Sequence, residues 1–313
     1  MRGPVIRPMV FGLSIAVGAV GMSAPVFAQA EDSEGSAITT IASGLTNPRG
    51  FAWSADGTLY LAQAGRGGDN HVAAMEGYTV DNGLTASVAV VADGCASPVV
   101  VGLPSVLWQE AGWVWGAADV AFLGDDTYAL LGGAGPNWLS PSSASGVYRL
   151  DGDGTMALIA DISSWLPDHP PAEIPFDYQT DGSLFDLQAA GDALLLSEAV
   201  GGQLIRVTPA GEITTVADLS AGHPVPTGIA VDAEGNAFVG YLTAAPYPEG
   251  GAKVVKVAPD GTVSDEWTGL TVVTGVALGP DGALYAAEMA TGLSSGSVER
   301  PAASGRIVRQ TGP

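Results

Sequence analysis

Apolar and polar positions follow the same short pattern five times along the chain. Each copy is an apolar run, a tight turn and a second apolar run, as in GVALGPDGALYAAEM at 275–289. Glycine supplies the positive φ that such turns require, and proline presets the first turn residue. The pattern predicts β-hairpins at 50–64, 119–133, 186–200, 228–242 and 275–289.

A second kind of hairpin lies between these copies, at 146–161, 202–218 and 251–267. The resulting unit of four antiparallel strands, repeated in a chain with 44 glycines and 21 prolines, is typical of β-propeller blades. We therefore predict an all-β fold: a single β-propeller domain at 38–313 with five four-stranded antiparallel blades. A sixth blade would require a divergent copy within 65–118.

The last repeat lacks its fourth strand, because residues 305–313 supply only a third strand and a turn. The segment ITTIASGL at 38–45 resembles ITTVADL at 213–219, the fourth strand of an earlier repeat. We expect the N-terminal strand to complete the C-terminal blade and to close the ring, which would remove the open sheet edges.

The N-terminal residues have the features of an export signal. Arg2 and Arg7 precede an apolar stretch at 9–24, which is short for a membrane span. Ala28 and Ala30 each end a cleavage motif of small residues. We predict a signal peptide at 1–28, cleaved after Ala28 or Ala30, and a disordered segment at 29–37. The mature protein would be periplasmic or secreted, with no membrane insertion after cleavage.

The charge of the chain restricts the classes of molecule that it can bind. Lys and Arg number 11 against 33 Asp and Glu, a formal net charge of −22, so the surface repels nucleic acid and anionic lipid. We expect a monomer that binds a small molecule or a protein, and no nucleic acid.

Cys95 is the only cysteine, which excludes an intramolecular disulfide. We expect Cys95 to be either a small buried residue or a turn residue.

The two faces of the predicted propeller differ in the length of their connections. Turns within hairpins are tight and share one face, whereas connections between hairpins and between blades share the other, which we call the long-loop face. Long loops on a rigid scaffold usually carry function. The long connections are 65–86, 103–118, 132–145, 163–185, 220–227, 243–250 and 290–304.

Residues at the start of each innermost strand should ring the central channel on the long-loop face. They are Asn47, Arg49, Asp119, Asp186, Thr227 and Thr274. One arginine beside two carboxylates suits a polar ligand, or a metal held by Asp119 and Asp186. It suits equally well a salt bridge that plugs the channel.

Two regions of the long connections contain further candidate groups. Tryptophans gather there, at Trp108, Trp113, Trp115 and Trp138. Exposed, they would suit a sugar, aromatic or polymer ligand; buried, they would pack the loops together. The glycine-rich GRGGDNH at 65–71 could form an anion-binding nest of backbone amides.

The run ASGLTNPRGFAWSADGTLYLAQAGRGG at 42–68 resembles the opening of ScyD/ScyE family proteins, exported propellers related to NHL-type repeats and named after scytonemin biosynthesis clusters. Further matches are GLPS at 102–105, DVAF at 119–122, VPTGIAV at 225–231 and GPDGALY at 279–285. Ala117 and Ala118 depart from the family pattern, which has Pro-His there. The resemblance implies a fold and an export route rather than a reaction.

The sequence features are consistent with two different functions. The leading interpretation is a propeller that binds a small molecule or a protein through its long-loop face, without chemistry or a cofactor. The alternative is a Ca²⁺-dependent hydrolase or lactonase-like propeller enzyme, which would need oxygen ligands to converge at the channel mouth. Those lactonases resemble one another in carrying a Glu before the first inner strand, where this chain has Arg49. A positive charge there favours binding over hydrolysis.

Overall fold

The computed structural model describes residues 39–73, 79–136, 143–293, 301 and 303–311. The segments predicted as a signal peptide and a disordered region, 1–28 and 29–37, lie outside these residues. Thr40–Pro313 is one compact unit, and the description below concerns this unit. No helix in its described part is long and apolar enough to cross a membrane.

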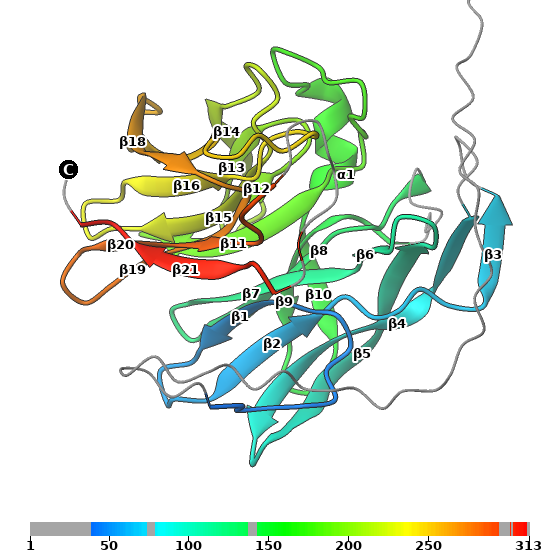
Figure 1. Cartoon of the computed structure of the whole chain (residues 1–313). Coiled ribbons are helices and arrows are strands. Elements are labelled where there is room, and N and C mark those ends of the chain that lie inside the picture. Colours follow the sequence, from blue (N-terminus) through cyan, green and yellow to red (C-terminus); the bar gives the residue numbers. More distant parts are fainter. Residues whose placement is uncertain (1–38, 74–78, 137–142, 294–300, 302, 312–313) are drawn as a thin grey trace, which may run out of the picture. The chain divides into compact units, whose positions relative to one another are not determined.

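Five antiparallel sheets follow one another along the described chain and form the blades of a β-propeller, which confirms the predicted fold (Figure 1). The first has six strands and begins with β1 (Pro48–Trp53), β2 (Leu59–Gln63) and β3 (Asn70–Ala73). It continues with β4 (Thr79–Ala92), β5 (Cys95–Trp108) and β6 (Trp113–Trp115). The second contains β7 (Ala117–Leu123), β8 (Asp126–Leu131), β9 (Gly146–Leu150) and β10 (Met156–Asp161).

A short helix α1 (Ile162–Trp165) and a 3-10 turn η3 (Leu166–Asp168) lead into the third sheet. That sheet contains β11 (Leu184–Ala190), β12 (Ala193–Glu198), β13 (Gln203–Val207) and β14 (Ile213–Asp218). The fourth contains β15 (Pro226–Val231), β16 (Ala237–Tyr241), β17 (Ala252–Val257) and β18 (Val263–Leu270). The fifth has three described strands, β19 (Val273–Leu278), β20 (Leu284–Glu288) and β21 (Arg306–Arg309).

The hairpin turns form as their composition predicts. In the fifth sheet Leu278 pairs with Leu284, and the Gly282 amide donates to the Gly279 carbonyl at 2.9 Å. Gly282 has a φ of 78°, the left-handed conformation that favours glycine. Local turn chemistry therefore sets the register of the strands on either side.

Alternate residues of each strand fill the spaces between neighbouring sheets. On β8, Tyr128 and Leu130 pack with residues of the third sheet, while Ala129 and Leu131 pack with residues of the first. Two further clusters join the third sheet to the fourth and the fourth to the fifth. The first strands pack in succession, β1 on β7, β7 on β11, β11 on β15 and β15 on β19. This period of two is what a strand buried on both faces requires.

The N-terminal segment does not close the ring in the expected way. Residues 39–45 form no strand, and β21 pairs with β20 and no other strand among the described residues. The Ser43 amide donates instead to the Gly94 carbonyl in the β4–β5 turn, at 3.4 Å. The Thr46 amide donates to Oε1 of Gln63 at 2.8 Å. These bonds hold the segment against the first sheet, where the sequence had predicted a strand of the fifth.

Two regions predicted as long connections in the first blade are largely strand. β4 and β5 contain 14 residues each, and β3 and β6 pair with their far ends. This long ribbon occupies 65–118, the stretch considered for a sixth blade. Cys95 begins β5 directly after the Asp93–Gly94 turn, and its side chain is exposed. Of the two environments expected for this cysteine, it therefore has the one beside a turn and not the buried one.

Candidate functional site

The long-loop face can be located from the pairing of the first two strands in each blade. Antiparallel register brings Pro48 beside Gln63, Leu184 beside Glu198, and Val273 beside Glu288. The starts of the innermost strands and the ends of their neighbours therefore share one edge of each sheet. The candidate groups below lie at or near this edge.

Asp119 and Asp186 connect successive blades through their carboxylates. Asp119 accepts from the Val120 amide at 2.8 Å and from the Leu187 amide of the third sheet at 2.9 Å. Asp186 accepts from the Ile229 amide of the fourth sheet at 3.2 Å. These hydrogen bonds replace backbone partners that inner strands lack between blades, which gives both residues a structural role.

Asp119 and Asp186 are buried close enough together for the charge of Asp186 to raise the pKa of Asp119. Burial, and next the charge of Asp186, raise the pKa of Asp119 well above its usual range. Burial raises the pKa of Asp186 to about 6. The arrangement therefore favours a neutral Asp119 beside an ionised Asp186, since two adjacent buried carboxylates do not both ionise readily.

The uncharged ring residues also use their side chains within the protein. Asn47 donates from Nδ2 to the Gly65 carbonyl at 2.7 Å. Thr227 is fully buried and donates to carbonyls of the fourth and fifth sheets, at 3.0 and 2.8 Å. The Thr274 hydroxyl donates to the Ala287 carbonyl at 3.4 Å. Of the six predicted ring residues, these three stabilise the loops and blade junctions.

Arg49 is different, because its guanidinium lies between two aromatic rings. Its Cζ is 5.9 Å from the centroid of the Trp115 ring and 5.7 Å from that of Phe185, both within cation–π range. The side chain is exposed, yet enough protein surrounds it for desolvation to lower the pKa of the guanidinium. Arg49 is therefore accessible to solvent and still close enough to other protein groups for its charge to be partly desolvated.

No carboxylate of the described residues lies within 4 Å of the Arg49 guanidinium, and desolvation is the one resolved influence on its pKa. The ordinary arrangement in this chain is an ion pair with an acid, as formed by Arg149, Arg206, Arg306 and Arg309. A partly desolvated charge without an acidic partner among the described residues is costly, and an opposite charge would lower that cost.

The predicted loop aromatics divide between packing and exposure. Trp108 and Trp115 pack on Val80 and Val106 at the far end of the first sheet. Trp113 in β6 is 50 % exposed. Trp138 lies outside the described residues. Trp115 therefore both packs the ribbon and contacts Arg49.

Glu198 occupies a position that three blades use in the same way. Gln63, Glu198 and Glu288 end their second strands, and Oε1 of each accepts from a loop amide, at 2.8, 2.9 and 2.6 Å. The other side-chain atom of Gln63 donates to Ser87, and that of Glu288 accepts from Arg306. Glu198 alone leaves this atom, its Oε2, without a hydrogen-bond partner in the described structure.

Burial raises the pKa of Glu198 to about 7, because an ionised carboxylate is disfavoured in a fully enclosed site and hydrogen bonds from backbone amides offset only part of this effect. Tyr178 lies beside it, and its buried hydroxyl also lacks a hydrogen-bond partner. Burial, and next the charge of Glu198, raise the pKa of Tyr178. Nothing in the sequence indicates this site beyond an acid at the end of an apolar run.

A hollow of about 660 Å³ lies between the third and fourth sheets, within the range of small-molecule sites. Two loops, 221–224 and 243–248, supply much of its lining. His223, Val225, Thr243 and Tyr247 in or beside these loops have φ values of 52°, 56°, 69° and 49°. Such left-handed conformations cost roughly 1–3 kcal/mol each in residues other than glycine and cluster at functional sites.

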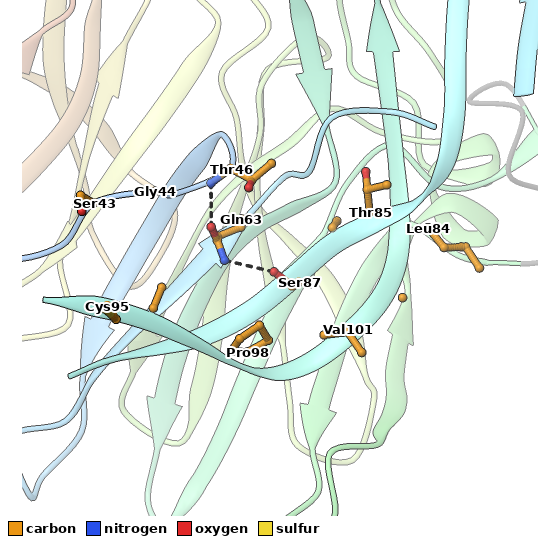
Figure 2. Close-up of a pocket in the computed structure, with 13 residues that line it drawn as sticks. Ser43, Gly44, Thr46, Gln63, Leu84, Thr85, Ser87, Cys95, Pro98 and Val101 are labelled. Atoms are coloured by element: carbon orange, nitrogen blue, oxygen red, sulfur yellow. Dashed lines mark hydrogen bonds between the residues drawn. The ribbon is translucent and has the colours of Figure 1, made fainter. Parts of the chain in front are cut away.

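A second hollow, of about 470 Å³, lies on the first sheet (Figure 2). Figure 2 shows the N-terminal segment with Thr46 on one side, Gln63 and Ser87 at the base, and Cys95 at one end. Gln63 hydrogen-bonds both Thr46 and Ser87, so the polar groups at the base have partners already. Its lining contains no ionisable group other than Cys95. This hollow therefore has few groups that could bind a ligand specifically or react with it.

Two amides of the glycine-rich segment at 65–71, which could have formed an anion nest, are bonded within the protein. The Arg66 amide donates to the Thr85 hydroxyl, and the Gly67 amide to the Ser105 hydroxyl, both at 2.9 Å. These two amides are therefore unavailable to an anion. His71 pairs with Asp81, whose hydrogen bond raises the pKa of the imidazole.

The described residues do not fit the Ca²⁺ site that the enzymatic alternative requires. Calcium takes six to eight oxygen ligands. In the described part of the chain no three His, Cys, Asp or Glu side chains are grouped to hold a metal ion. The ring carboxylates Asp119 and Asp186 already accept backbone amides.

Comparisons with known proteins add similar solved structures. A putative oxidoreductase (glucose dehydrogenase) from Thermus thermophilus is 16% identical, covering 87% of this chain and 98% of that one, with a TM-score of 0.48. The PQQ-bound aldose sugar dehydrogenase of Streptomyces coelicolor is 15% identical, covering 87% and 96%, with a TM-score of 0.43. A luciferin-regenerating enzyme is 14% identical, covering 86% and 92%, with a TM-score of 0.46.

No protein-family model matches the chain. No curated protein matches it in a sequence search either. The propeller assignment accordingly rests on the sheets and their packing, and the ligand and reaction have to be argued from this chain's own residues. The resemblance to ScyD/ScyE proteins, export and the periplasmic or secreted location stay predictions.

Proposed function

We propose that the protein binds a ligand through its long-loop face, and that the recess around Arg49 takes a carboxylate with an apolar or aromatic body. The observation that carries this proposal is the Arg49 guanidinium, held between two rings with no described carboxylate as partner. The role is binding rather than catalysis. Export from the cytoplasm, as the N-terminal residues predict, belongs to the same proposal.

An anion is the ligand that suits Arg49 best, for two reasons. It supplies the opposite charge that a desolvated guanidinium lacks. Its hydrogen bonds to the guanidinium are charge-assisted, so they are stronger than neutral ones and often bidentate. The rings of Trp115 and Phe185 add apolar surface on either side, which suits a ligand with a flat hydrophobic part. Both features act together only for a molecule that has a small anionic head on an apolar body.

The net charge of −22 restricts the class of anion further. A polyanion such as a nucleic acid would be repelled by the rest of the surface, whereas a monoanion is repelled far less. A carboxylate of the benzoate type therefore fits best. A protein partner would have to present the same chemistry, such as a C-terminal carboxylate beside an aromatic side chain.

Benzoate titrations test this proposal. We expect saturable binding to the wild type and a loss of about tenfold or more in Arg49→Gln, because one charge-assisted interaction with a ligand is removed. Arg206→Gln serves as the matched control, since Arg206 already pairs with Asp192 at 2.8 Å. Equal affinities of the two variants would contradict the proposal. Isothermal titration calorimetry measures both.

Stability separates a binding role of Arg49 from a structural one. Removing one partner of a buried ion pair costs about 3–5 kcal/mol, but Arg49 has no described acid partner to leave behind. Loss of two cation–π contacts is offset by relief of desolvation, so Arg49→Gln should change the free energy of unfolding by about 1 kcal/mol or less. Urea denaturation measures this, and a loss of several kcal/mol would indicate that Arg49 is structural.

A further inference from the structure

We infer that the hollow between the third and fourth sheets is a second binding site, for a neutral sugar or polyol. The site is separate from the Arg49 recess in its residues and in its chemistry. It stands on the shape of the hollow, on its polar groups without partners and on the pairing of its charged groups.

The loops that line the hollow are held in place before any ligand arrives. The Thr243 amide donates to the Pro224 carbonyl at 2.8 Å, and the Leu242 amide to the Val225 carbonyl at 2.9 Å. These bonds fix the loop that follows the third sheet against the loop that follows β16. They also maintain the left-handed conformations of His223, Val225 and Thr243. Preorganised walls of this kind lower the cost of binding.

The unsatisfied polar groups at the hollow are neutral or need no ionic partner. The Thr243 hydroxyl is buried and has no hydrogen-bond partner in the described structure. Nε2 of His223 makes no hydrogen bond in the described structure, although an Asp177 oxygen lies at ion-pair distance, 3.5 Å away. A hydroxyl donates and accepts at once, and an imidazole nitrogen does one or the other according to its tautomer. Ligand hydroxyls complement both groups.

The lysine of the lining is already paired with a carboxylate, and the other carboxylate, Asp218, accepts backbone amides. Lys253 pairs with Asp265 at 2.5 Å. Asp218 accepts from the Ser220 amide at 3.0 Å and from the Ala172 amide at 2.7 Å. An anionic ligand would therefore find no free positive charge in the lining, whereas sugar hydroxyls can donate to the lone pairs that the two carboxylates retain.

Apolar walls complete the fit. Pro224, Pro246 and Pro248 line the hollow together with Tyr241. Phe176 is 96 % exposed, and its ring lies edge-on to that of the lining residue His223, with centroids 6.3 Å apart. Rigid apolar surfaces beside hydroxyl-binding groups suit the C–H faces of a sugar ring.

The test uses maltose, cellobiose and glucose as probes, with choline as a cationic comparison. We expect at least one sugar to bind saturably and choline not to compete with it. Thr243→Val keeps the shape and β-branching of the side chain but lacks the hydroxyl. We expect it to weaken binding about tenfold, the effect of one lost hydrogen bond. Thr215→Val, an exposed strand position outside the hollow, should bind as the wild type does.

A second pair of variants tests the location. Ala244→Trp fills the hollow and should abolish sugar binding, whereas Ala210→Trp in the exposed β13–β14 turn should not. The inference is overturned if no sugar of the three saturates, if choline binds in their place, or if Thr243→Val and Ala244→Trp both bind normally. Arg49→Gln should leave sugar binding unchanged, which keeps this result independent of the benzoate site.

Discussion

Gly50→Ala is expected to lower the free energy of unfolding by about 3 kcal/mol or more, which is large for the addition of one methyl group. A Cβ placed on Gly50 would lie 1.8 Å from Oδ1 of Asp119 and 2.2 Å from its Cγ. The carboxyl cannot move away cheaply, because it is 3 % exposed and accepts the amides of Val120 and Leu187. Either the hydrogen bonds between blades break or the first sheet shifts. Thermal or urea unfolding measures the loss.

A control and a double variant make this result specific. Gly152→Ala lies in the exposed β9–β10 turn, where an added Cβ meets nothing within 4 Å, so its stability should stay within about 0.5 kcal/mol. Asp119→Ala removes the clash along with the carboxylate, so Gly50→Ala should cost much less in that background than in the wild type. Additive losses in the double variant would show that the two residues do not conflict.

The stability of the wild type should fall by about 3 kcal/mol through Glu198 alone as the pH rises from about 4.5 to about 7. The folded-state pKa of about 7 exceeds the unfolded value near 4.5, so the folded state holds the extra proton within this window. Folding is then favoured at low pH, and the advantage is lost as Glu198 ionises. Asp186, with a pKa raised to about 6, acts in the same direction.

Glu198→Gln isolates the contribution of this residue. Glutamine still presents an oxygen to the Ser183 amide but does not ionise, so its unfolding free energy should be flatter across the same pH window. Glu288→Gln is the matched control, because Glu288 has the same place in the fifth sheet but pairs with Arg306. That variant should be destabilised at neutral pH. Urea midpoints at about pH 5 and pH 8 decide; parallel profiles for wild type and Glu198→Gln would refute the role of Glu198.

The fold followed from the sequence because its signals are local. Strand alternation and turns such as Gly279–Gly282 involve neighbouring residues, so each hairpin could be predicted independently of the others. Closure of the ring depends on tertiary contacts. Residues 38–45 have a strand-like pattern, yet the bonds of Ser43 and Thr46 to the first sheet hold the described part of this segment elsewhere. A pattern of residue types does not indicate which sheet edge a strand will meet.

The candidate site was predictable only in part. The placement of Arg49 at a strand start and of Trp115 in a long connection followed from the repeats. The contact of Arg49 with Phe185 joins different blades and has no local signal. The lone oxygen of Glu198 and the left-handed φ of Thr243 depend on packing around residues that look ordinary in sequence. A site that consists of polar groups without hydrogen-bond partners cannot be recognised until all neighbours of those groups in the structure are known.

A crystal structure with 4-bromobenzoate tests the proposed binding function most directly, because anomalous scattering locates the bromine without bias. We predict a carboxylate on the Arg49 guanidinium and a ligand ring packed against the neighbouring aromatic side chains, with no bromine in crystals of Arg49→Gln. Bromine bound elsewhere, or equally in both proteins, would contradict the proposal that Arg49 forms an anion-binding recess.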